Sequence, residues 1–193
     1  MRAARAVRAE LDQRHRYEHV VRVARMAAQL AVAHGVDPLR ARLAGLLHDL
    51  ARLYPVERVL RECEARGMAI GAFERANPIV LHARLGAELA RERFGIDDPA
   101  ILSAIRKHTV ADGVMSPLDA VVYLADGLEP GRTFPERAAL AGLAYDNLDG
   151  AMRAVLVSSI AYLAARGLAV APQTLDAARA YGISLPTEER SPA

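Results

Sequence analysis

Residues 37–50 read DPLRARLAGLLHDL, a segment that begins as a capped helix and ends with a histidine beside an aspartate. The opening Asp-Pro is typical of a helix start, because aspartate accepts hydrogen bonds from free backbone N–H groups and proline fits the first helical position. Apolar residues then recur at helical spacing through about Leu50. The segment therefore predicts a core helix that carries His48 and Asp49 toward the protein interior.

Similar helix signals occur on both sides of this segment. The predicted starts are Pro55, Asn77-Pro78, Asp98-Pro99 and Ser116-Pro117. Glycine ends many helices because it adopts the left-handed conformation without steric cost. The predicted stops are Gly35, Gly67, Gly95 and Gly167, the last of them after a long final helix from about Asn147 to Arg166. Strand patterns are nearly absent, so the sequence predicts an all-α fold.

Length and composition indicate one globular domain. The chain has 193 residues, of which 52% are hydrophobic and 25% are charged, and these values are typical of a folded domain. No repeat or low-complexity linker divides the sequence. We therefore expect a single domain over residues 1–193, with its core at about 10–175 and a frayed polar tail from about 187.

Charge, hydropathy and cysteine content exclude several classes of protein. The chain has 25 Lys+Arg and 23 Asp+Glu, so it lacks the strongly basic character of a nucleic-acid-binding domain. The longest apolar run, 154–165, is shorter than the ~20 residues of a membrane span. The single cysteine, Cys63, excludes an intrachain disulfide and fits a reducing compartment. We expect a cytoplasmic protein that uses no nucleic acid or membrane, while its oligomeric state stays open.

Histidines and aspartates recur at inward-facing positions on separate predicted helices. The set is His19, His48, Asp49, His82, His108 and Asp126. A single histidine on a helix is more often structural than a ligand. Imidazole and carboxylate donors from several helices, however, form metal sites in helical bundles, and they suit iron, manganese or zinc. A carboxylate buried among leucines would also be costly without such a partner. The pattern therefore favours a metal site in the core.

The order His…His-Asp…Asp resembles the signature of the HD-domain metal-dependent phosphohydrolases. Longer segments resemble the YqeK-type family within that superfamily, and the similarity covers roughly residues 10–175. These segments are 15–19 (HRYEH), 44–49 (AGLLHD), 77–87 (NPIVLHARLGA), 104–109 (AIRKHT) and 125–132 (ADGLEPGR). The family consists of bacterial symmetrical bis(5′-nucleosyl)-tetraphosphatases, which split diadenosine tetraphosphate into two ADP.

The resemblance implies an HD-domain helical bundle with two metal ions in its core. The implied ligands of the first ion are His19, His48, Asp49 and Asp126. Those of the second are His82 and His108, with Asp49 as the bridge. The implied metal is iron, and the donor chemistry leaves manganese or another transition metal open. A hydroxide held between the two ions would attack an inner phosphorus of the substrate.

Polar residues beside these donors are the predicted phosphate contacts. Arg52 lies three residues after Asp49, and we expect it to act in catalysis by stabilising phosphate charge. The further candidates for substrate binding are Lys107, Thr109 and Arg132. Arg132 could instead cap a loop or pair with Glu129. Three features depart from the family pattern. Arg52 stands where lysine is usual, Gly131 stands where asparagine is frequent, and the loop 110–115 lacks a glycine that relatives commonly carry soon after the threonine.

Two other functions stay open beside the symmetrical tetraphosphatase. The chain could be another HD phosphohydrolase, which acts on nucleoside 5′-monophosphates, cyclic nucleotides or alarmones. It could also be a non-catalytic HD module that binds a nucleotide or a partner protein. The complete ligand set argues against the module. Product analysis separates the two enzymes, and metal content separates both from the module.

Overall fold

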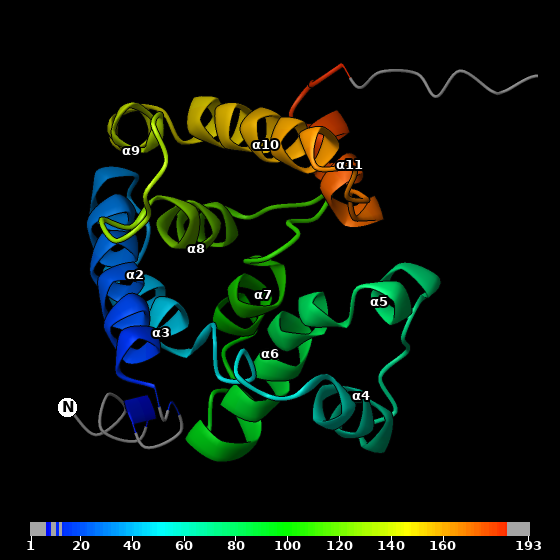
Figure 1. Cartoon of the computed structure of the whole chain (residues 1–193). Coiled ribbons are helices and arrows are strands. Elements are labelled where there is room, and N and C mark those ends of the chain that lie inside the picture. The colour runs from blue at the N-terminus through cyan, green and yellow to red at the C-terminus, as the bar shows by residue number, and fades with distance from the viewer. Residues whose placement is uncertain (1–6, 9–10, 12, 185–193) are drawn as a thin grey trace, which may run out of the picture.

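The computed structural model describes residues 7–8, 11 and 13–184, and over these residues the fold is helical without a strand. The predicted all-α class is confirmed. The polar tail expected from about residue 187 lies outside the described residues. The helices form one bundle whose centre is crossed by α2, α3, α6, α7 and α8 (Figure 1).

The bundle consists of ten described α-helices and one short 3-10 helix. In chain order they are α2 (Arg14–Ala33), α3 (Pro38–Leu47), α4 (Val56–Ala65), α5 (Ala72–Ala76), η1 (Pro78–Val80), α6 (Leu81–Phe94), α7 (Pro99–Lys107), α8 (Pro117–Leu128), α9 (Arg137–Asp146), α10 (Leu148–Ala165) and α11 (Pro172–Ala180). Figure 1 shows α4 and α5 on one side of the central helices, and α9, α10 and α11 together at another.

The predicted helix signals act as expected. The Asp37 side chain accepts a hydrogen bond from the Leu39 N–H (2.8 Å), and Asp98 caps α7 in the same way. Ser116 and Asp119 form a reciprocal capping box at the start of α8. The four predicted stops all have positive φ: Gly35, Gly67, Gly95 and Gly167. These helix starts and ends are therefore determined by local sequence, within a few residues of each boundary.

Two helix predictions were wrong. Helix α3 ends at Leu47, not near Leu50, so His48 and Asp49 lie in the turn that follows it. The Leu50 N–H donates a hydrogen bond to the Leu47 carbonyl, and the Arg52 N–H donates to the Asp49 carbonyl. Both bonds span three residues, as in a 3-10 helix, so the chain is wound more tightly here than in an α-helix. The helix that ends at residue 165 is not the last one, because α11 follows it.

Helix α10 is the one helix of the described residues that is long and apolar enough to cross a membrane by length and composition. Its 18 residues have a mean hydropathy of 1.3, and 22% of them are buried. One such helix is weak support for a membrane span, because helices packed in a protein core have the same composition. The inner face of α10 contributes to the core through Ala151, Met152, Val155 and Leu156.

Helices α2 and α3 approach each other closely at Gly45. A Cβ atom at this position would lie 3.0 Å from the Cα atom of Ala24, which is backbone and cannot turn away. This contact places the helix that carries His19 beside the turn that carries His48 and Asp49.

We expect Gly45→Ala to lower the free energy of unfolding by about 1–3 kcal/mol, because the added methyl group forces α2 and α3 apart. Urea unfolding followed by circular dichroism measures the loss. Gly142→Ala in α9 is the matched control, since a Cβ there meets no atom within 4 Å. Equal stability of the Gly45 variant and the wild type would contradict this packing.

Candidate metal centre

Six side chains from five segments meet in the middle of the bundle. They are His19 from α2, His48 and Asp49 from the turn after α3, His82 from α6, His108 directly after α7, and Asp126 from α8. All except Asp126 are buried. The structure therefore brings together all six residues that the sequence predicts as metal ligands.

Asp49 lies between two pairs of histidines. Its Oδ2 atom is 3.5 Å from His48 Nε2 and 3.7 Å from His19 Nε2. Its Oδ1 atom is 3.4 Å from His82 Nε2 and 3.9 Å from His108 Nε2. Each carboxylate oxygen thus faces a different pair. Asp126 completes the first group, with its Oδ1 atom 3.1 Å from His19 Nε2.

The four histidines are all held through Nδ1. The bonds run from His48 to Gly45 O (2.7 Å), from His82 to Ile79 O (2.5 Å), from His108 to Ile105 O (2.7 Å) and from His19 to Glu129 Oε1 (3.0 Å). A neutral imidazole that donates through Nδ1 carries a lone pair on Nε2. The acceptors at Nδ1 therefore direct all four lone pairs toward the centre of the cluster.

These lone pairs fit a metal ion better than they fit the protein alone. The Nε2 atoms of His19 and His48 are buried and have no hydrogen-bond partner among the described residues. The Nε2 atoms of His82 and His108 lie 3.2 Å apart, so two acceptors face each other. The Thr109 hydroxyl lies 3.0 Å from His108 Nε2 and 3.3 Å from His82 Nε2, and its one proton can serve only one of them. Buried acceptors without a donor are costly. A cation bonded to nitrogen at about 2.0–2.1 Å would satisfy all of them.

The pKa values of His108, Asp49 and Asp126 also suit metal binding. Burial, followed by the neighbouring histidines, lowers the pKa of His108 to about 3. Burial raises the pKa of the Asp49 carboxyl, but the surrounding imidazoles outweigh it and hold that pKa well below its usual range. In Asp126, too, burial acts upward and is outweighed, mainly by His19, so its pKa is low. Neutral imidazoles and ionised carboxylates are the forms that ligate metals.

A cavity of about 310 Å³ opens onto this cluster. It is lined by Arg16, Asp49, Arg52, Ile79, His82, Thr109, Asp126 and Arg132. Arg16 Nη1 donates to Asp49 Oδ2 (2.8 Å), and Arg132 Nη2 donates to Asp126 Oδ1 (2.6 Å). Three guanidinium groups beside the cluster make the cavity suitable for a polyphosphate anion.

The structure places three of the four predicted phosphate contacts in this cavity, namely Arg52, Thr109 and Arg132. The fourth, Lys107, does not line it. The Lys107 ammonium donates to the Val114 carbonyl and lies 3.3 Å from Asp119 Oδ2. It therefore joins the end of α7 to the start of α8, directly beside the residues that carry the cluster.

Two residues of the site were missed by the sequence analysis. Arg16 precedes His19 by three residues, and Glu129 follows Asp126 by three. Residues three apart lie on the same side of a helix, so each of the two lies close to a predicted metal ligand. This spacing is the signal that could have identified them. Burial raises the pKa of Glu129, but Arg22 and His19 lower it to about 2. Glu129 is thus an ionised carboxylate that fixes the His19 ring, and it pairs with Arg22 and not with Arg132.

We expect Glu129→Gln to weaken metal binding by about 10–100-fold, the usual cost of altering a group that orients a metal-ligating histidine. The glutamine keeps the size of the side chain but loses the charge that stabilises Arg22 and His19. Elemental analysis after dialysis against increasing chelator measures the effect. Glu136→Gln, at an exposed position, serves as the control. Identical metal retention in the two variants would show that Glu129 does not orient His19 for metal binding.

The helical bundle and its histidine–aspartate cluster define a class of protein. Residues 16–131 match the HD domain model, and the chain belongs to the HD-domain family. It is 34% identical over 160 residues to the symmetrical bis(5′-nucleosyl)-tetraphosphatase of Bacillus subtilis (strain 168), a match that covers 83% of this chain and 86% of the relative. The protein of the same name from Halalkalibacterium halodurans is 34% identical over 161 residues, with the same coverage.

A solved structure shares the fold over nearly the whole chain. It is the crystal structure of a predicted HD superfamily hydrolase involved in NAD metabolism from Clostridium acetobutylicum. The TM-score is 0.89 at 31% sequence identity, and the match covers 93% of this chain and 95% of the other. The family resemblance seen in the sequence is confirmed. The chain is a hydrolase of the HD family, and its clustered histidines and aspartates are of the kind that bind divalent metal ions.

Proposed function

We propose that the chain hydrolyses diadenosine tetraphosphate symmetrically to two ADP. The observation that carries the proposal is the cluster of six donors at a cavity lined by three arginines. A dinucleoside tetraphosphate is strongly anionic, and its inner phosphates require several cations for binding and for stabilisation of the leaving group. The relatives named as symmetrical tetraphosphatases match over most of both chains and support the choice of this substrate.

We propose two metal positions, one on each side of Asp49. His19, His48 and Asp126 would hold one ion, and His82 and His108 the other. The support is that the two oxygens of Asp49 face separate histidine pairs. Divalent ions at such sites polarise phosphoryl oxygens and lower the pKa of bound water. We propose iron as the metal, because imidazole and carboxylate donors suit it and no thiolate takes part.

The chain's own residues bind and orient the phosphates. Arg16, Arg52 and Arg132 surround the cavity with positive charge, and the planar guanidinium groups suit phosphate oxygens. The Thr109 hydroxyl lies 3.0 Å from His108 Nε2, where it can donate to an incoming phosphate. Lys107 would act indirectly by holding the ends of α7 and α8 together. These groups would bind the phosphates of one ADP half and leave the other half free to depart.

We also infer that the protein works in the cytoplasm on a soluble nucleotide. Its one cysteine, Cys63, is a free and buried thiol in α4. Burial raises the pKa of this thiol, which keeps it protonated and unreactive. A thiol without a disulfide partner suits a reducing compartment, where small nucleotides are also found.

Chromatography of the reaction products tests the proposed function. Full-length protein loaded with iron or manganese is given diadenosine tetraphosphate, and we expect ADP as the product. Formation of AMP and ATP would refute symmetrical cleavage. A loaded protein that leaves this substrate intact but hydrolyses a nucleoside monophosphate, a cyclic nucleotide or an alarmone would establish the alternative HD phosphohydrolase.

A further inference from the structure

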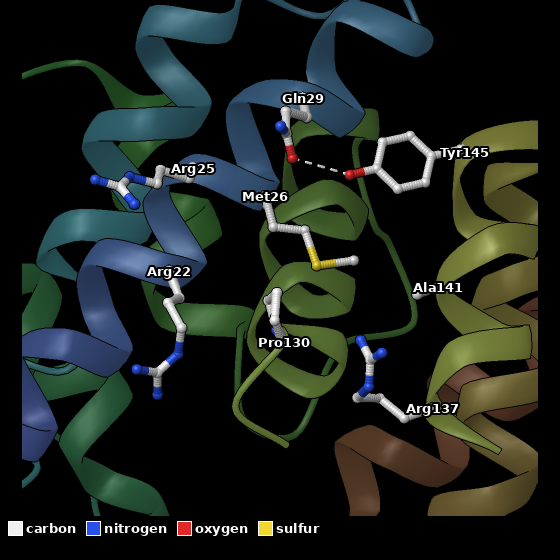
Figure 2. Close-up of a pocket in the computed structure, with 8 residues that line it drawn as sticks. All are labelled: Arg22, Arg25, Met26, Gln29, Pro130, Arg137, Ala141 and Tyr145. Atoms are coloured by element: carbon white, nitrogen blue, oxygen red, sulfur yellow. Dashed lines mark hydrogen bonds between the residues drawn. The ribbon is translucent and has the colours of Figure 1, made fainter. Parts of the chain in front are cut away.

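A second cavity, of about 470 Å³, lies beside α2 and α9. It is lined by Arg22, Arg25, Met26, Gln29, Pro130, Arg137, Ala141 and Tyr145. Figure 2 shows Met26, Gln29 and Tyr145 between α2 and α9, while the Arg25 side chain extends from α2 away from Tyr145. A volume of this order is typical of small-molecule sites and larger than a single inorganic phosphate needs.

The lining is cationic, and two of its arginines, Arg25 and Arg137, have no acidic residue beside them in the lining. Three of its eight residues are arginines, and none is acidic. Arg22 is paired with Glu129 behind the wall, and Arg137 donates to the Leu128 carbonyl. Arg25 is exposed and can turn toward a ligand. Because the charge of Arg22 is balanced by Glu129, an anion that binds there gains mainly from the guanidinium groups of Arg25 and Arg137.

The remaining lining is apolar and aromatic. Met26, Pro130 and Ala141 supply carbon and sulfur surface, and Tyr145 contributes its ring. The Tyr145 hydroxyl donates to Gln29 Oε1 (3.0 Å), the dashed line in Figure 2, and this bond holds the ring between α9 and α2. A flat heterocycle suits such a surface, because aromatic rings and thioethers pack well on planar π-systems.

This cavity is separate from the one at the metal cluster. The two share no lining residue, and the segment 130–132 runs between them, with Pro130 on one side and Arg132 on the other. Gly131 keeps this wall thin, because any Cβ atom there would collide with the Arg22 guanidinium. A larger residue at this position would require the Arg22 side chain to shift.

We propose that the second cavity binds a nucleoside phosphate, with its phosphates on Arg25 and Arg137 and its base against Met26 and Tyr145. Binding there requires no hydrolysis, so the proposal goes beyond the proposed function and does not depend on it. The combination of these two arginines with an apolar floor selects an anion that carries a flat organic group over a bare phosphate.

A fluorescent reporter tests the proposal directly. The chain has no tryptophan, so Tyr145→Trp in the full-length protein places a single indole in the cavity. ADP titrated into this variant should change the indole emission saturably. In Arg25→Glu/Arg137→Glu on the same background, the affinity should fall about tenfold or more, because charge-assisted bonds are replaced by repulsion. Arg42→Glu/Arg61→Glu, at exposed positions of α3 and α4, matches the charge change and should retain binding.

Each outcome of this titration decides the proposal. No saturable change at millimolar ADP would overturn it, and so would equal loss of affinity in the matched control. If pyrophosphate bound as tightly as ADP, the proposed contact between the base and the apolar side of the cavity would be wrong. Circular dichroism verifies folding, and Arg25→Glu alone, at an exposed residue, replaces the double variant if that variant unfolds.

Discussion

Asp49→Asn should reduce the rate of ADP formation more than about 100-fold, beyond the range for groups that only orient a ligand. Asp49 is 2% exposed, and each of its oxygens faces a histidine pair. Asparagine keeps the shape of the side chain but removes the negative charge. It also replaces one of the two carboxylate oxygens by an N–H₂ group, which cannot bind a metal ion. We therefore expect the variant to lose bound metal together with activity.

Initial rates and elemental analysis measure the two effects on the same preparation. Asp98→Asn is the matched control, because Asp98 caps the helix that precedes His108 and asparagine caps a helix about as well. The control should keep both metal and activity. An Asp49→Asn protein that is folded, fully loaded and active would exclude Asp49 from the centre of the site.

Arg16→Met should lower kcat/KM by about 10²–10³-fold, the range found when a preorganised donor to a developing charge is lost. The Arg16 side chain is 19% exposed, and one of its nitrogens is bonded to Asp49. Its Nε atom is buried and has no partner among the described residues. A guanidinium with spare donors in the cavity is suited to a phosphate of the substrate. Methionine fills similar space without charge.

The metal content of Arg16→Met distinguishes a substrate contact from support of Asp49. We expect wild-type metal content with a reduced rate. Loss of metal in this variant would instead show that Arg16 acts by holding Asp49 in position for the metal. Arg14→Met, two residues earlier on α2 and exposed, is the control and should behave as the wild type.

The helix boundaries that could be predicted are those determined by interactions between residues close together in the sequence. Asp37, Asp98 and Ser116 cap the helices that follow them through bonds that span two or three residues. The glycine stops depend on the conformational freedom of one residue. The end of α3 was misplaced because the residues through Leu50 keep the apolar spacing of a helix while the backbone tightens into a turn.

That these six histidines and aspartates lie together was also predictable, because imidazoles and carboxylates on apolar helix faces point toward the core and need polar partners there. Their supporting contacts were not. Whether Glu129 bonds to His19, whether Arg132 bonds to Asp126, and whether Lys107 faces the cavity or Asp119 depends on how α2, α7 and α8 cross. Residue type and spacing state which groups can interact. The packing of distant helices selects among these pairs, since an arginine or lysine reaches several carboxylates and only the assembled core fixes the distances.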